Sequence, residues 1–259
     1  AIGREAGVTH YSTQFSVARL WIIFIVGMAA MFGTLLYFGA QIYQAAPPIP
    51  AAVRTNTGET VFTREQIERG QNVWQSMGGM EQGSIWGHGS YVAPDWSADW
   101  LHREASALRD IIVREQSTQD YAALSAPDQA RADAVVRGQM RTNTYDAATG
   151  EITLSAQRAQ AVARTMDHFT ALFESSTPEA QSLRAEYAFP LHATLNADDA
   201  RDVAAFFFWT SWAAGTNRPD QDITYTSNWP HEPLVGNNPS GSVFMWTFIS
   251  IFTLLAGIG

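Results

Sequence analysis

The stretch GQNVWQSMGGMEQGSIWGHGSYVAPDW, residues 70–96, decides how this chain folds, because it ends one helix and continues into a glycine-rich loop. Apolar side chains at near-helical spacing lead into it, namely Ile67, Val73, Trp74 and Met77. The pair Gly78 and Gly79 then ends the helix, since glycine weakens a helix interior. Upstream, Thr63 with Gln66 three residues later forms the capping-box pattern that begins a helix.

The sequence beyond this stretch indicates a mainly helical domain. Helical patterns and start signals predict further helices in residues 100–112, 125–141, 155–174 and 196–213, and another helix that begins near Thr177. Residues 145–154, YDAATGEITL, have a glycine where a tight loop needs a positive φ, and they predict a small β hairpin with short strands.

One apolar run near the N-terminus is long enough to cross a bilayer. Residues 20–40 are uncharged and supply about the ~20 residues that a membrane-spanning helix needs, so we predict a transmembrane helix over residues 18–43. A cleaved signal peptide is the alternative, but its apolar core is shorter. Arg4 and Arg19 precede the run, and no positive charge follows before Arg54, which predicts that residues 1–17 are cytoplasmic.

A second apolar run, residues 242–259, predicts the start of another transmembrane helix, cut short at the last residue. Residues 44–241 then form an outward-facing domain, which opens with the proline-rich linker AAPPIP at residues 45–50. The sequence therefore indicates the beginning of a multi-pass membrane protein, with the lipid bilayer as one partner.

Composition excludes several classes of function. The 259 residues include 25 acidic and 16 basic side chains, and the basic ones are scattered arginines, so nucleic acid is not expected as a partner. Hydrophobic residues make up 46%, with nine tryptophans, which argues against disorder. Cysteine is absent, which excludes disulfides, thiolate metal sites, cysteine nucleophiles and haem attached by thioether bonds.

Residues 70–96 resemble the cytochrome-c domain of one particular family. This family is the haem-c-bearing subunit of the two-subunit nitric oxide reductases. That subunit has a glycine and a tryptophan on its first helix, then C-x-x-C-H, then a G-E-G-A-Y-x-A-P stretch. Gly70 and Trp74 match the helix. Five residues match the second stretch without a gap: Gly87, Gly89, Tyr91, Ala93 and Pro94.

In this register the family's two cysteines and its haem-ligating histidine fall on Gly79, Gln82 and Gly83, none of which can hold haem covalently. The chain therefore resembles the single-chain, quinol-dependent nitric oxide reductases, in which a cytochrome-c-like domain without haem c is fused to the catalytic membrane part. Other matching segments are residues 93–104, 203–218, 228–230 and the apolar run from residue 242.

The resemblance also implies a calcium site. In the haem-c subunit, the glycine and tyrosine that match Gly89 and Tyr91 help to hold a calcium ion, and a glycine can serve because calcium accepts backbone carbonyl oxygens. The alternative is that Gly89 permits a turn and Tyr91 packs with a satisfied hydroxyl.

Other conspicuous residues have two interpretations each. Trp74, Trp86, Trp96 and Trp100 either line the space that haem once filled or are ordinary core residues. His88 either binds a metal or is a solvated loop histidine, and the spacing of the remaining histidines does not indicate a zinc site.

The charged residues also have two interpretations. Arg103 and Arg218 either contact haem propionates or pair with acidic neighbours. Asp95 and Asp99 could share a helix face but indicate no catalysis.

The resemblance implies that the complete protein reduces two nitric oxide molecules to nitrous oxide and water with electrons from quinol. Its haem b, haem b3 and non-haem iron would be held beyond residue 259, so no catalytic residue is assigned here. This portion would anchor and cap the catalytic helix bundle of the same polypeptide in the bacterial inner membrane, on the periplasmic side. A homodimer is compatible with the sequence.

Two other functions remain open. In the first, the chain is a membrane-anchored extracytoplasmic sensor, which would continue into cytoplasmic signalling helices rather than into spans that contain histidines. In the second, it is an electron-transfer cytochrome with non-covalent haem, which haem absorbance of residues 44–241 would reveal.

Overall fold

The computed structural model describes residues 16–87, 94–189 and 194–258 and divides into two units, residues 1–46 and 47–259. The first unit contributes one long helix, α1, Val17–Gln44. Its N-cap is Ser16, whose side chain accepts a hydrogen bond from the backbone N–H of Arg19. At 1.5 Å per residue, 28 residues extend for about 42 Å.

Within the described residues, α1 is the one helix long and apolar enough to cross a membrane. The long apolar helix expected near the N-terminus is therefore present, and its crossing of a membrane at residues 18–43 stays a prediction. The last helix, α8, Gly241–Ile258, is also apolar, but its described apolar part, Phe244–Ile258, is shorter than a full span. The second membrane crossing therefore stays a prediction.

The second unit is mainly helical, as expected from the sequence. Its longer helices are α2 Arg64–Ser76, α3 Trp96–Gln116, α4 Ala126–Arg141, α5 Ala156–Glu174, α6 Pro178–Glu186 and α7 Ala197–Gly215. Three short 3-10 helices join them: η1 Gly79–Glu81, η2 Tyr121–Ala123 and η3 Pro233–Val235. Each longer helix begins at a capping side chain that accepts a backbone N–H, namely Thr63, Asp95, Ser125, Ser155, Thr177 and Asn196.

A four-stranded sheet replaces the isolated hairpin that the sequence predicts. The strands are β1 Ala52–Thr55, β2 Thr60–Thr63, β3 Tyr145–Asp146 and β4 Glu151–Leu154, in the order β2-β1-β4-β3. The hairpin β3–β4 is confirmed, with Gly150 at φ 72°. The antiparallel pair β1 and β2 was missed, and so was the parallel pairing that joins β1 to β4, about a hundred residues away.

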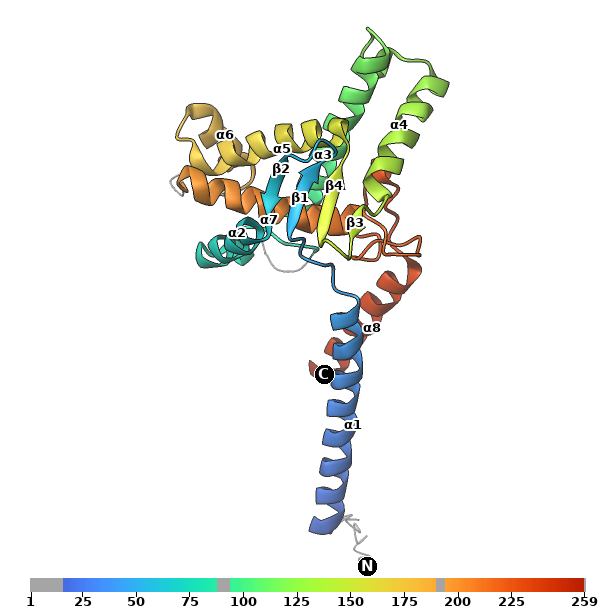
Figure 1. Cartoon of the computed structure of the whole chain (residues 1–259). Coiled ribbons are helices and arrows are strands. Elements are labelled where there is room, and N and C mark those ends of the chain that lie inside the picture. The colour runs from blue at the N-terminus through green and yellow to red at the C-terminus, as the bar shows by residue number, and fades with distance from the viewer. Residues whose placement is uncertain (1–15, 88–93, 190–193, 259) are drawn as a thin grey trace, which may run out of the picture. The chain divides into compact units, whose positions relative to one another are not determined.

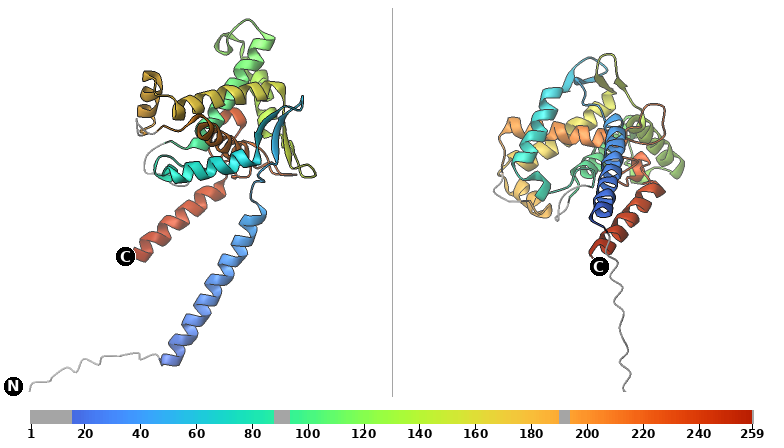
Figure 2. Two further views of the ribbon diagram at one scale, coloured as in Figure 1. Left: turned by 60° about the vertical axis from the view of Figure 1, so that its left-hand side comes forward. Right: turned by 90° about the horizontal axis from the view of Figure 1, so that it is seen from below.

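Helix α7 forms the centre of the second unit, with α2, α3 and α5 packed around it (Figures 1 and 2). Ala200 and every residue from Asp202 to Gly215 are buried. A helix that is apolar on all sides is expected to be fully enclosed. The sheet contacts the same helix, since the ring of Phe62 on β2 lies 5.2 Å from that of Phe208.

Helix α2 crosses α7 at Gly70, where the two backbones approach closely. A Cβ atom on Gly70 would lie 1.9 Å from the carbonyl oxygen of Asp202 and 3.0 Å from Cβ of Phe206. Beside the crossing, Nε of Arg69 lies 2.8 Å from the carboxylate of Asp202. Only glycine allows this approach, so Gly70 determines how the first helix of the domain sits on the last.

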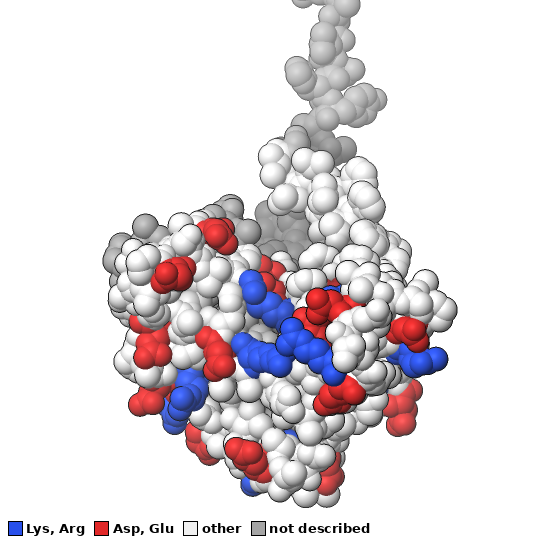
Figure 3. Space-filling view, turned by 90° about the horizontal axis from the view of Figure 1, so that it is seen from above, with Lys and Arg blue, Asp and Glu red and all other residues white. Residues whose placement is uncertain are grey.

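The face seen in Figure 3 has arginine and acidic side chains intermixed rather than separated. Among the described residues, exposed charges also form pairs, such as Arg131 with Asp128 at 3.4 Å on α4. Exposed pairs of this kind contribute little to stability, and the buried aromatic side chains described below dominate the packing.

Substitution of Gly70 tests the crossing. We expect Gly70→Ala to lower the free energy of unfolding by about 1–3 kcal/mol, because the new methyl group collides with backbone that cannot move aside. Gly138→Ala is the matched control, since Gly138 also lies inside a helix but has no atom within 4 Å of its Cβ position. It should leave stability unchanged or raise it by about 0.5–1 kcal/mol. Urea unfolding followed by circular dichroism gives both values, and equal losses in the two variants would contradict the close crossing.

Candidate functional site

The three positions that match the haem-attachment motif, Gly79, Gln82 and Gly83, lie together between α2 and α3. Gly79 begins η1 directly after Gly78, which adopts a left-handed conformation with φ 74°. Gln82 follows η1, and its amide nitrogen donates a hydrogen bond of 3.1 Å to the carbonyl oxygen of Met77. Gly83 is buried, with φ 158°. The site is therefore compact, and each of its positions already has a close neighbour.

Tryptophan rings occupy the space that side chains at the two glycines would need. A Cβ atom on Gly79 would lie 2.2 Å from ring atoms of Trp74, which comes from α2. A Cβ atom on Gly83 would lie 1.9 Å from Nε1 of Trp96, which comes from α3. Real Cβ atoms do not approach that closely, so neither a cysteine at Gly79 nor a histidine at Gly83 fits this packing.

Trp96 is the centre of an aromatic cluster, and its side chain is fully buried. It stacks on Phe207 of α7, with ring centroids 5.3 Å apart and an interplanar angle of 5°. Five more rings lie within 6.4 Å of it, from Trp74, Phe169, Phe173, Tyr187 and Phe189. Rings in offset or edge-on contact add to the stability gained from burial alone.

The tryptophans that the sequence singles out are buried or half-buried, and Trp74 and Trp96 also stand at the haem-attachment positions. Trp74, Trp96 and Trp100 are at most 1% exposed and pack as core residues. The indole N–H of Trp100 donates to Glu104 at 2.9 Å, and Glu104 forms a buried ion pair of 2.7 Å with Arg158. Trp86 is partly buried and donates to the backbone carbonyl of Thr210 at 2.8 Å.

Asp95 organises the chain where it returns from this loop to α3. Its carboxylate accepts hydrogen bonds from Ser84 Oγ at 2.8 Å and from the backbone N–H groups of Gly87 at 2.6 Å and Ala98 at 2.9 Å. It also contacts the hydroxyl of Ser97. Asp95 is thus a helix cap rather than a partner of Asp99.

Part of the matched stretch cannot be placed. His88, Gly89, Tyr91 and Ala93 lie outside the described residues, as does His192, so the calcium site expected at Gly89 and Tyr91 stays a prediction. Within the described residues, no three or more His, Asp or Glu side chains are grouped so that they could hold a metal ion.

Asp99 belongs to a polar network on the edge of the aromatic cluster. Arg103 donates to both of its carboxylate oxygens at 3.1 Å, and the hydroxyl of Tyr187 donates to it at 2.7 Å. Arg103 also donates to the Tyr187 oxygen at 2.6 Å, and His168 Nε2 lies 3.4 Å from the same oxygen. Of the two interpretations of Arg103, the described structure shows pairing with an acidic neighbour.

Burial and charge set the protonation of this network. Burial raises the pKa of Tyr187 well above its usual range, and the hydrogen bond to Asp99 acts in the same direction. Burial lowers the pKa of His168 to about 4, and the positive charge of Arg103 acts in the same direction. At neutral pH, His168 is therefore uncharged and Tyr187 keeps its proton.

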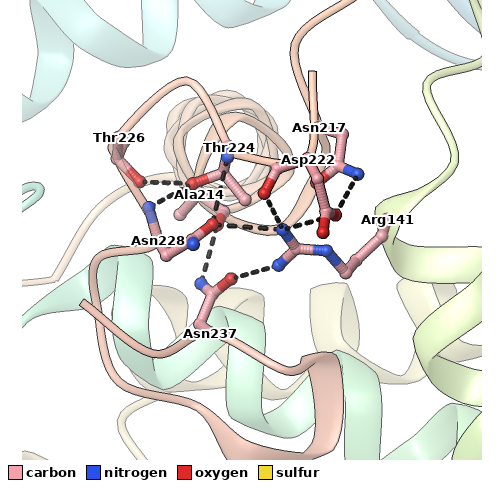
Figure 4. Close-up of polar contacts among 8 residues, drawn as sticks. All are labelled: Arg141, Ala214, Asn217, Asp222, Thr224, Thr226, Asn228 and Asn237. Atoms are coloured by element: carbon pink, nitrogen blue, oxygen red, sulfur yellow. Dashed lines mark hydrogen bonds and ion pairs between the residues drawn. The ribbon is translucent and has the colours of Figure 1, made fainter. Parts of the chain in front are cut away.

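A second polar cluster fixes the loop that follows α7 (Figure 4). Arg141, at the end of α4, donates to the side-chain oxygens of Asn237 at 3.0 Å and Asn228 at 3.1 Å. Asn237 in turn donates to the backbone carbonyl of Ala214 at 2.8 Å. Burial lowers the pKa of Arg141, although the group stays charged. Arg218 does not join this cluster, and it donates to the carbonyl of Tyr225 at 2.8 Å.

Sequence inspection missed the role of Arg141. Asparagine-rich segments with proline are typical of ordered turns, which is the one signal that residues 217–237 carry. The partner of those asparagines comes from a helix 87 and 96 residues away, and no local pattern indicates it.

His168 gives the domain a pH dependence that can be measured. Because its folded pKa of about 4 lies below the unfolded value near 6.5, protons bind the unfolded chain first, and stability should fall as pH drops through that window. We expect His168→Gln to flatten this part of the curve of melting temperature against pH. His231→Gln changes an exposed histidine outside the network and should keep the wild-type slope. An unchanged slope in His168→Gln would refute the assignment.

Comparisons with known proteins identify a family for most of the second unit. A family model for the NorB cytochrome c-like domain of nitric oxide reductase matches residues 50–231, which is more than two thirds of the chain. A comparison with individual curated proteins found no match. The matched range begins at the linker before β1, contains the three closed positions and ends in the loop after α7.

Proposed function

Because the chain belongs to the family of the NorB cytochrome c-like domain of nitric oxide reductase, we propose that it is the N-terminal part of a single-chain nitric oxide reductase that takes its electrons from quinol. The whole reaction would combine two nitric oxide molecules, two electrons and two protons into nitrous oxide and water. The irons that bind nitric oxide would be held by other parts of the polypeptide, and this chain would supply no catalytic residue.

The packing at Gly79 and Gly83 is the observation that supports quinol as the donor. A cytochrome-c domain relays electrons from soluble carriers only through its haem, and the places where haem would be attached are filled by Trp74 and Trp96. Cysteine is also absent from the chain. If this domain carries no haem, electrons must reach the catalytic part by another route, and a donor dissolved in the membrane supplies one.

The role that remains for this portion is to anchor the polypeptide and to cover the catalytic membrane helices. The linker that follows α1 is bound at two points, since Nε1 of Trp209 donates to the carbonyl of Pro48 at 2.9 Å and Arg64 donates to the carbonyl of Ile49. At the other end, the loop before α8 is held by Arg141. Because both connections to apolar helices are fixed to the same folded unit, the domain suits a rigid cap over a membrane-helix bundle.

The membrane orientation belongs to the same proposal. The arginines at positions 4 and 19 precede α1, whereas the next positive charge is Arg54, and this asymmetry favours a cytoplasmic N-terminus. The folded unit would then lie on the periplasmic side of a bacterial inner membrane, and α8 would return toward the cytoplasm.

Donor specificity tests the proposal. In full-length protein purified in detergent, we expect a reduced quinol analogue to support the consumption of nitric oxide, measured with an electrode. A donor that arrives through the membrane does not need a haem in this domain. Reduced soluble cytochrome c should support none above background.

Turnover with cytochrome c and none with quinol would contradict the proposal. Absence of turnover with both donors, together with tight binding of a small ligand, would favour the sensor interpretation instead. The control is the same preparation with its donor omitted, which measures the chemical loss of nitric oxide.

A further inference from the structure

Trp229 is an exposed tryptophan on the surface of the second unit. Outside α1 and α8, the described residues with exposed large apolar side chains are Trp229 and Val135, each 37% exposed. Val135 lies on α4. Trp229 lies in the loop between α7 and α8, twelve residues before Gly241 begins α8. Between α1 and α8, the other described tryptophans are buried or half-buried, so its exposure sets Trp229 apart from them.

The loop around Trp229 is built to hold the residue in one place. Ser227 and Asn228 have φ angles of 59° and 62°, a backbone region that residues other than glycine rarely adopt. The conformation is fixed by paired bonds, since the backbone N–H of Asn228 donates to Oγ1 of Thr224 at 2.8 Å and the backbone N–H of Thr224 donates to Oδ1 of Asn228 at 3.1 Å.

Two further contacts fix the neighbouring backbone. The backbone N–H of Trp229 donates to the carbonyl of Thr226 at 3.2 Å, and Arg141 holds the side chain of Asn228 (Figure 4). Such a conformation persists only where its surroundings enforce it. The position of the indole ring is therefore determined by the fold rather than left to a free loop.

A continuous series of contacts joins Trp229 to the point where the chain arrives from α1. Pro48 accepts the indole N–H of Trp209, and the ring of Trp209 lies 5.5 Å from that of Trp86. Gly87 follows Trp86, and a Cβ atom on Gly87 would lie 2.8 Å from Nε1 of Trp229. Trp229 is thus linked through these contacts to the segment that arrives from α1, and its own loop leads into α8.

We propose that the indole ring of Trp229 inserts into the headgroup layer of the lipid bilayer and fixes the height of the folded unit above the membrane. An indole ring suits this layer because its apolar body can enter the lipid while its N–H edge stays among polar groups. The inference needs only that α1 and α8 enter a bilayer, so it stands apart from the proposed reaction.

The absence of cysteine makes a site-specific test possible. One sample carries a single nitroxide label at Trp229→Cys, and a second sample carries it at Val135→Cys. In both, the whole chain is reconstituted in phosphatidylcholine nanodiscs. Power-saturation EPR then compares collisions with oxygen, which concentrates in lipid, and with a water-soluble nickel chelate. Val135 is the matched control, because its exposed fraction is the same and it lies on a different element.

We expect the label at residue 229 to show a higher ratio of oxygen to nickel collisions than the label at residue 135, which should behave as in water. Equal, water-like ratios at both positions would refute membrane contact. Low collision rates with both reagents at residue 229 would also refute the proposal, because they would mean that protein covers the ring. If circular dichroism shows that Trp229→Cys does not fold, a label at His231→Cys, an exposed position two residues later, gives the same comparison.

Discussion

The stack of Trp96 on Phe207 is the contact on which the rest of this structure depends. Trp96 is the first residue of α3 and Phe207 lies in the middle of α7, so the stack fixes the helix that follows the glycine-rich loop against the central helix. Trp74 meets both rings from α2, at 5.6 Å and 5.2 Å. Three helices are thereby joined through one set of aromatic contacts, and the same rings fill the space beside Gly79 and Gly83.

Stability and the proposed loss of electron transfer therefore have one physical origin. A cytochrome-c domain surrounds a large planar group, and removal of that group would leave a cavity whose cost grows with its volume. In this chain, indole and phenyl rings pack beside Gly79 and Gly83, and we propose that they take the place of that group. The close crossing of α2 and α7 at Gly70 preserves the arrangement of the first and last helices of the domain. A scaffold that keeps its helix packing without its prosthetic group can still cover and anchor, which is the role we propose for it.

The sequence predicted the helices well because their start signals are local. Ser125, Ser155, Thr177 and Asn196 each cap the helix that they were expected to begin. It missed β1 and β2, of which β1 pairs with β4 about a hundred residues away, and it missed Arg141, which binds asparagines far along the chain. The motif register located Gly79 and Gly83 but not the rings that close them, since no spacing rule shows that Trp96 would turn back toward Gly83.

The free energy of unfolding of Trp96→Ala tests the central claim most directly, with Val135→Ala as the control at an exposed apolar side chain on α4. If the aromatic cluster holds the domain together, urea unfolding should show a loss of about 3–5 kcal/mol for Trp96→Ala. The control should change by less than about 0.5 kcal/mol, as is usual for surface positions. Losses of the same small size in both variants would contradict the account, because the haem-attachment positions would then be closed by a ring that the fold does not need.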